Sequence, residues 1–354
     1  MITATAHERP GVYSSYEASS LIAASANGRK VAVIAAGKSA DGAQDGKTVY
    51  QWTSYGKAAA DVGDCTLSRL AQLAIRNGAG AVYGIPLTSA GDGGETYEAA
   101  FAAAAAIEDV SVVVCDSTRL EVQQKLRDMV LECSGARKER IAVVGGAAGE
   151  SVDELVKRAG RLNCERVVLV APGMGGESGG AGCAAAVAGA IAGTADPALP
   201  RGGAQLYGLE GLERSYDDGE IDALVQGGVT ALETLAGAYY VVRGVTTRTR
   251  TGDTPDATWR ELSTILVVDE VIPGLRRALR ARFSRAKNTR QTRGAIRSQA
   301  VMELEKRVSQ EIIDSYEDVT VSALEDDPTV CLVEFTFTVA HGLNQVWLSA
   351  HITV

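Results

Sequence analysis

Asp64-Cys-Thr-Leu-Ser-Arg-Leu-Ala-Gln-Leu-Ala-Ile75, followed after a short link by Gly80-Ala-Val-Tyr-Gly-Ile85, is the stretch from which the fold class follows. In its first part the apolar residues recur every three or four positions, which predicts a helix with one buried face, Asp64 as N-cap and Gly78 at its end. The second part is an apolar run of strand length. A helix that leads into a buried strand is the repeating unit of an α/β domain.

The same alternation extends from Lys30 to about Arg243 and predicts a largely parallel sheet. Strands are predicted at Val31–Ala36, Gly80–Ile85, Val110–Cys115, Ile141–Val144, Val167–Val170 and Tyr239–Val245. Further helices are predicted near Tyr97–Ile107, Leu120–Cys133, Val152–Leu162 and Ala181–Ala192. The last of these is so rich in small residues that it must pack closely on neighbouring backbone.

The pattern changes in the last third of the chain. Helices are predicted at Ile272–Ala286 and Thr289–Ile313, and strands at Ser263–Val271, Val319–Ala323, Thr329–Val339 and Gln345–Val354, with a turn at Asp326-Asp327-Pro328. The residues before Lys30 contain Pro-Gly but no helical period, which predicts an extended arm.

The last predicted strand has one apolar face along its whole length, because Val346, Leu348, Ala350, Ile352 and Val354 alternate with more polar residues. A strand this regular needs a partner. It either forms the edge of the chain's own sheet or is donated to a neighbouring subunit, where main-chain hydrogen bonds supply the affinity.

Composition argues against several classes of function. The 354 residues carry 35 Lys and Arg against 44 Asp and Glu, a net charge of −9 that opposes nucleic-acid binding. The three histidines lie only in the terminal segments and the six cysteines lack CxxC spacing, so neither a catalytic residue nor a metal site is predicted. No apolar run reaches the roughly 20 residues of a membrane span, and no export signal is recognisable, which predicts a cytoplasmic protein without membrane insertion.

Three glycine clusters raise the alternative of a Rossmann-like nucleotide-binding enzyme. Gly78–Gly84, Gly145–Gly149 and Gly173–Gly182 each lack a complete phosphate-binding pattern, and Ser178 stands where GxGxxG needs its third glycine. Turns and tight helix–sheet packing are the preferred interpretation, and no cofactor is predicted.

Residues 274–302 contain a block of basic residues without any acidic one. Its members are Arg276, Arg277, Arg280, Arg282, Arg285, Lys287, Arg290, Arg293 and Arg297. Three roles stay open for this basic block: nucleic-acid binding, a solvated helix face with internal ion pairs, or contact with an acidic protein surface.

Several motifs, taken in order, resemble the tail sheath proteins of contractile phage tails and of phage-tail-like bacteriocins. They are Arg9-Pro-Gly-Val-Tyr13, Pro172-Gly173 with Ala184–Ala192, Gly227-Gly-Val with Val241–Thr247, Arg260–Ile272, and the basic helix that ends Phe283-Ser-Arg-Ala-Lys-Asn288. Each motif is weak alone, but their order and spacing cover nearly the whole chain.

The resemblance implies a chain that is α/β, and α+β overall. An N-terminal arm (1–28) and an inner sheath domain of helices and a small sheet (239–344) enclose an inserted outer α/β domain (29–238), and a C-terminal strand arm (345–354) follows. It implies a structural subunit, not an enzyme, that stacks as six-fold rings around an inner tail tube protein and contracts to drive the tube through a target envelope. Non-closing contacts between copies generate such helical polymers.

The resemblance also implies the contacts of the subunit. The expected subunit-interface arms contain Pro10, Gly11, Val12, Tyr13 and Tyr16 at one end, and Val346, Trp347, Leu348, Ala350, Ile352 and Val354 at the other. The expected tube-facing residues are Arg276, Arg277, Arg280 and Arg282. Baseplate and tail terminator proteins are further expected partners. Assembly is expected in the bacterial host cytoplasm, as part of a virion tail or of a released phage-tail-like particle.

Overall fold

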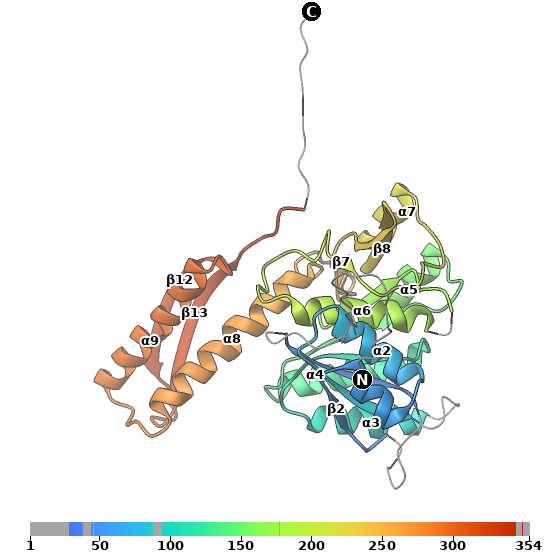
Figure 1. Cartoon of the computed structure of the whole chain (residues 1–354). Coiled ribbons are helices and arrows are strands. Elements are labelled where there is room, and N and C mark those ends of the chain that lie inside the picture. Colours follow the sequence, from blue (N-terminus) through green and yellow to red (C-terminus); the bar gives the residue numbers. More distant parts are fainter. Residues whose placement is uncertain are drawn as a thin grey trace, which may run out of the picture.

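A nine-stranded sheet forms the body of the molecule (Figure 1). The computed structural model describes residues 28–37, 44, 46–87, 94–176, 178–344 and 349. In spatial order the strands are β2 (Tyr50–Trp52), β3 (Ala81–Leu87), β1 (Lys30–Ala36), β4 (Val110–Cys115), β5 (Ile141–Gly145), β6 (Val167–Ala171), β8 (Val229–Leu235), β9 (Ala238–Val241) and β7 (Gln205–Leu206). The six strands from β3 to β8 are parallel, and β2, β9 and β7 are antiparallel to their neighbours.

Helices cover both faces of this sheet, so the central strands are apolar on both sides, as in doubly wound folds. One face carries α1 (Tyr55–Val62), α2 (Thr66–Arg76) and α6 (Gly179–Gly193). The other carries α3 (Gly94–Ala106), α4 (Leu120–Gly135), α5 (Val152–Leu162) and α7 (Asp218–Gln226). The predicted α/β fold is confirmed.

A smaller unit, which we call the C-terminal lobe, projects from this body (Figure 1). It consists of α8 (Leu262–Phe283), α9 (Arg290–Ser309), β12 (Ile313–Ala323) and β13 (Cys331–Val339), and a short hairpin of β10 (Arg250–Thr251) and β11 (Thr254–Pro255) precedes it. Its core forms where Val267, Val271 and Leu275 of α8 meet Leu304 of α9 and Ile313 of β12. The lobe therefore has a core separate from the two cores of the body.

The first half of α8 corrects the sequence prediction. Ser263–Val271 was predicted to be a strand and is helical. The reason is burial on two sides: Ile265 and Leu266 pack against the sheet, whereas Val267 and Val271 pack in the lobe. A segment buried on two sides lacks the polar stripe that reveals a helix, and a short apolar run cannot be assigned by periodicity alone. Pro273 lies inside the helix.

Three smaller corrections concern the body. The strand predicted at Tyr239–Val245 ends at Val241, and it belongs to the large sheet, which therefore continues past the expected boundary at residue 238. β8 had not been predicted. Cys65, and not Asp64, occupies the N-cap of α2, while Asp64 forms an ion pair with Arg69. Asp217 is the N-cap of α7.

The close packing predicted for α6 is confirmed. A Cβ atom on Gly189 would lie 2.3 Å from the carbonyl oxygen of Ala74 in α2, and one on Gly193 would lie 2.8 Å from the Cα of Gly78. These contacts are with backbone, which cannot rotate away. The small residues of α6 therefore set the distance between α6 and α2.

This packing predicts that Gly189→Ala lowers the free energy of unfolding by about 1–3 kcal/mol, because the added methyl group overpacks a backbone contact. The matched control is Gly160→Ala in α5, where a Cβ meets nothing within 4 Å. There the better helix propensity of alanine should raise stability by about 0.5–1 kcal/mol. Urea unfolding of both variants measures the two changes, and the same sign for both would contradict the packing argument.

Candidate assembly surfaces

The hairpin of β12 and β13 presents one apolar row to the helices of the lobe. In β13, half-buried residues alternate with exposed ones, and the rings of Phe335 and Phe337 stack with centroids 6.1 Å apart. Within the described part of the chain each strand pairs only with the other, so each has one open edge. The register shifts between Glu317 and Thr320, where a bulge bends β12. A two-stranded sheet is marginal alone, so these edges are suited to accept further strands.

The chain leaves β13 toward the body instead of turning back along the hairpin. A Cβ on Gly342 would lie 2.0 Å from Cγ of Pro200, which places residues 340–344 beside the loop before β7. Leu343 is 78% exposed there and lines a groove of about 670 Å³. All the residues predicted for the two arms lie outside the described residues: Pro10, Gly11, Val12, Tyr13, Tyr16, Val346, Trp347, Leu348, Ala350, Ile352 and Val354.

The four arginines predicted to face a tube lie along the second half of α8 and differ in their contacts. Arg276 forms an ion pair with Glu139 at 2.9 Å. Arg282 donates to Oε1 of Gln299 at 2.6 Å. Arg277 and Arg280 are exposed and form no ion pair with any described residue. Two of the four are thus held by contacts within the chain, and two are available to another surface.

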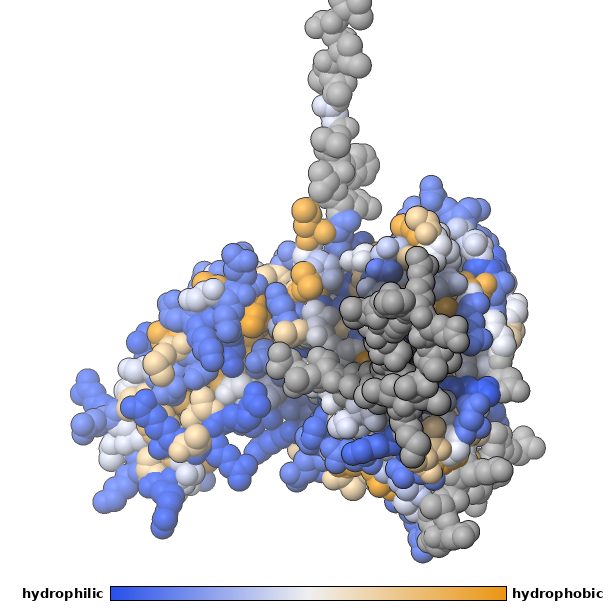
Figure 2. Space-filling view, viewed as in Figure 1, coloured by the Kyte–Doolittle hydropathy of each residue, from blue (hydrophilic) through white to orange (hydrophobic). Residues whose placement is uncertain are grey.

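A cleft of about 760 Å³ separates α8 from the edge of the sheet at which β4 and β5 begin. The sheet side is lined by residues 108–112, 137–139 and 141, and the helix side includes Pro273, Arg276, Arg277 and Arg280. In the space-filling view, hydrophilic side chains lie on both sides of the hollow between the lobe and the body (Figure 2). We call this hollow the basic cleft.

Ion pairs anchor the first half of α8 to the body beside the basic cleft. Arg166, the residue directly before β6, donates to both carboxylate oxygens of Asp269, at 2.8 and 2.9 Å. Both side chains are 11% exposed. Burial raises the pKa of Asp269, while the hydrogen bonds from Arg166 act in the opposite direction. Arg29 pairs with Glu270 at 3.3 Å. One wall of the cleft is therefore fixed relative to the sheet.

The glycine clusters serve close packing, as predicted. A Cβ on Gly145 would lie 2.2 Å from the carbonyl carbon of Gly180, and one on Gly180 would lie 2.2 Å from the oxygen of Gly146. At Gly182 an added Cβ would meet Sδ of Met174 at 2.2 Å. Helix α6 thus begins directly on the loop after β5, and the Met174 thioether packs on its first turns.

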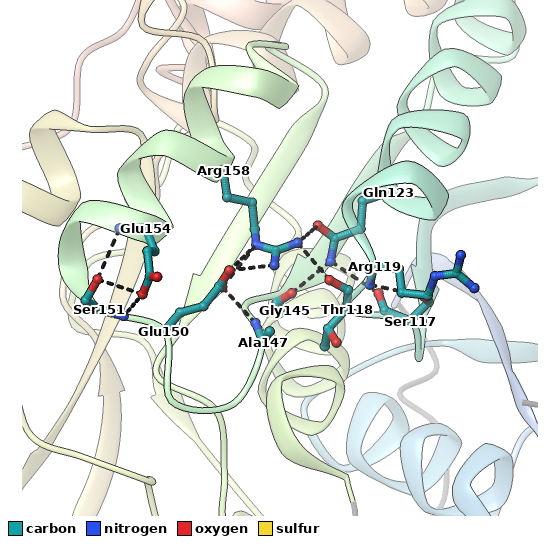
Figure 3. A network of polar contacts seen from close by, with 10 residues as sticks. All are labelled: Ser117, Thr118, Arg119, Gln123, Gly145, Ala147, Glu150, Ser151, Glu154 and Arg158. Carbon is teal, nitrogen blue, oxygen red and sulfur yellow. Dashed lines mark hydrogen bonds and ion pairs between the residues drawn. The ribbon is translucent and has the colours of Figure 1, made fainter. Parts of the chain in front are cut away.

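A polar network fixes the same loop (Figure 3). Glu150 accepts hydrogen bonds from Arg158 Nη2 at 2.6 Å and from the backbone N–H of Ala147 at 2.9 Å. Arg158 also donates to the carbonyl of Thr118 at 2.7 Å, and Gln123 donates to that of Gly145 at 2.9 Å. No buried side-chain atom of this network lacks a partner in the described structure. The network therefore holds this loop in place.

The described ranges hold neither a metal-ligand cluster nor a membrane-spanning helix. No three His, Cys, Asp or Glu side chains gather there as metal ligands. No helix in that part of the chain combines the length and the apolar character needed to cross a bilayer.

Sequence reasoning missed the basic cleft, because its charges come from separate elements. Arg137 and Lys138 belong to the loop between α4 and β5, whereas Arg277 and Arg280 lie about 140 residues later in α8. The one available signal was the Arg137-Lys138 pair directly before a buried strand, on the same sheet edge that α8 crosses.

Two family models match most of the chain. The phage tail sheath protein central domain matches residues 90–247, and the phage tail sheath C-terminal domain matches residues 254–353. A tail sheath protein of Bacillus phage SP01 is 27% identical over 254 residues. That match covers 69% of this chain but 43% of the relative, so this chain corresponds to less than half the length of that protein.

Solved structures show the same fold at low sequence identity. A chain in the anti-feeding prophage baseplate has a TM-score of 0.75 at 15% identity, over 99% of this chain and 100% of that one. The contracted helical sheath of the anti-feeding prophage gives 0.73 at 14%, over 98% and 99%. A sheath tail protein of Desulfitobacterium hafniense gives 0.66 at 12%, over 93% and 100%. With its central and C-terminal parts both matched, the chain belongs to the phage tail sheath protein family.

Proposed function

We propose that this chain is the structural subunit of a contractile tail sheath. It polymerises as stacked six-fold rings around an inner tail tube and contracts to drive the tube through a target envelope. The observation that carries the proposal is the open-edged β12–β13 hairpin, together with residues 340–344, which lead away from it toward the body. An open strand edge, in a chain that leads away from that edge after residue 339, is suited to strand exchange between neighbouring copies.

The terminal arms supply those strands. The apolar face formed by Val346, Leu348 and Ile352 fits the edge of a neighbour's hairpin, and the N-terminal arm around Pro10–Tyr13 adds on the other side. Such contacts link each copy to others without closing, which produces a helical polymer. One similar structure is of a contracted helical sheath and another is of a baseplate, which supports self-assembly and a baseplate partner for this chain as well.

The radial arrangement follows the two units of the fold. We place the sheet body outside and the C-terminal lobe with the arms inside, close to the tube. The sequence predicted this contact at Arg276, Arg277, Arg280 and Arg282. Because Arg276 is paired with Glu139, and Arg277 and Arg280 line the basic cleft, we assign the contact to the tip of the lobe instead. There, at and beyond the end of α8, lie Arg282, Arg285, Lys287 and Arg290. Opposite charge on the tube would set the register and rate of assembly.

The energy for contraction is stored in subunit packing in this proposal, without nucleotide hydrolysis and without a cofactor. The absence of nucleotide hydrolysis from this proposal is supported by the glycine-rich loop after β5, against whose backbone the start of α6 packs directly. Assembly takes place in the host cytoplasm, and a tail terminator protein caps the polymer. The product is a virion tail or a released phage-tail-like particle.

Negative-stain electron microscopy tests the proposed function. The purified chain, alone and co-expressed with an inner tail tube protein, should form hollow ridged cylinders with six-fold end views. Reversing Arg285, Lys287 and Arg290 to Glu should reduce cylinders on the tube more than tube-free cylinders. Discrete small particles under every condition would contradict the proposal, and equal loss of both kinds of cylinder would contradict only the assignment of the tube contact.

A further inference from the structure

Charge is strongly segregated along the chain. Residues 271–302 contain nine Arg and Lys and no Asp or Glu, whereas residues 202–242 contain seven Asp and Glu and one Arg. The first segment includes the helix side of the basic cleft. The second, which we call the acidic segment, contains α7 and the loop before it. In Figure 1, α7 and the C-terminal lobe lie on opposite sides of the molecule.

The basic cleft has an excess of cations that no carboxylate of the described chain neutralises. Four of its acidic residues are already paired: Asp109 with Lys30, Glu139 with Arg276, Asp269 with Arg166, and Glu270 with Arg29. Arg137, Lys138, Arg277 and Arg280 have no ion pair there, and Glu108 is the one lining carboxylate left for them. Two elements thus direct four cations into one hollow.

The acidic segment has the opposite excess. Its single cation, Arg214, is used by Glu220 at 2.7 Å. Glu210, Glu213, Asp218 and Asp222 are exposed and form no ion pair with described residues. A cationic surface on another molecule would therefore complement this unpaired negative charge.

The topology prevents the two surfaces from meeting within one chain. The cleft lies at the edge where β4 and β5 begin, because residues 108–110, 139 and 141 line it. The acidic segment lies at the opposite edge, because the N–H of Glu213 donates to the carbonyl of Gly173, just after β6 ends. A contact between them needs two copies, and it leaves a free cleft at one end of the pair and a free acidic segment at the other.

We propose that the acidic segment of one copy docks in the basic cleft of the next copy, as a head-to-tail contact of the sheath lattice. The inference rests on the proposed function and adds to it a contact between the bodies of neighbouring copies, separate from the arms and from the tube. A second copy is the favoured occupant because the chain itself carries the complementary charge, and its net charge of −9 disfavours nucleic acid.

A charge-swap experiment tests the contact. The cleft variant carries Arg137→Glu, Lys138→Glu and Arg277→Glu, and the acidic-segment variant carries Glu210→Lys, Asp218→Lys and Asp222→Lys. Each alone should raise the protein concentration needed for tube-free polymerisation by roughly tenfold or more, because like charges then face each other. A chain with all six changes, and an equimolar mixture of the two variants, should polymerise again near the wild-type concentration.

The outcomes separate the alternatives once circular dichroism shows that the variants are folded. If the variant with all six changes needs a polymerisation concentration as high as the two single-set effects combined predict, the contact does not exist. If wild type forms no polymer, the proposed function fails, and carbodiimide cross-linking of concentrated wild-type protein at low salt decides the contact. An intermolecular link from Lys138 to a carboxylate of residues 210–222 supports it, and the absence of that link overturns it.

Discussion

Truncation after Asn344 should leave a folded chain that no longer polymerises. Every buried residue of the three described cores lies before residue 320, and the partly buried residues around them end at Ala340. Removing residues 345–354 therefore takes no side chain from these cores. It removes the strand that is proposed to pair with a neighbouring subunit, and with it all the main-chain hydrogen bonds of that pairing. Sedimentation velocity should show monomer at concentrations where wild type forms cylinders, with an unchanged thermal midpoint.

Point variants within the same strand sharpen this test. Leu348→Asp with Ile352→Asp should abolish polymers as truncation does, because both residues lie on the apolar face. Ser349→Asp with Thr353→Asp adds the same charge to the other face and should retain polymers. If truncation unfolds the protein instead, the strand belongs to the chain's own fold and the exchange of strands is contradicted.

The sequence predicted the parallel strands well, because strands buried on both faces are short apolar runs between turns. β4 (Val110–Cys115) and α5 (Val152–Leu162) occur with the predicted bounds. For α5 the signal was complete: Ser151 caps the helix and accepts from the N–H of Glu154, and Asn163 ends it in the left-handed conformation.

The sequence failed where tertiary contacts decide the structure. The helical state of residues 263–271 depends on two separate cores that enclose it, and no local signal records them. β8 was missed because its polar half, Glu233 and Thr234, conceals a strand whose first four residues are buried. Its register against β6 is fixed by residues about 60 positions earlier in the chain.

The candidate surfaces were predicted in part. The basic block was evident from the sequence. Which of its arginines are paired within the chain was not, because Arg276 meets Glu139 only once α8 is folded across the sheet edge. The basic cleft required the fold, since its two walls are far apart in the chain. The hairpin that is proposed to accept strands was predicted from the alternation of Thr329–Val339, whereas its open edges follow only from the pairing.

Arg158→Met should lower the free energy of unfolding by about 3 kcal/mol, because it leaves the largely desolvated, part-buried carboxylate of Glu150 without its cation. The two side chains are 11% and 17% exposed. The variant also removes the donor that the Thr118 carbonyl accepts from. The matched control is Arg119→Met, whose pair with Glu121 at 3.5 Å is 52% and 81% exposed and should contribute less than about 1 kcal/mol.

Adding Glu150→Gln to Arg158→Met should restore part of the loss, because a neutral amide costs less to bury than an unpaired carboxylate. Urea unfolding of the single and double variants measures this coupling. The network lies at the loop after β5 (Figure 3). None of its residues lines the basic cleft, so its loss should change stability without changing assembly. At temperatures where the Arg158 variant remains folded, it should polymerise as wild type does, and a selective loss of polymers would place this loop in the lattice instead.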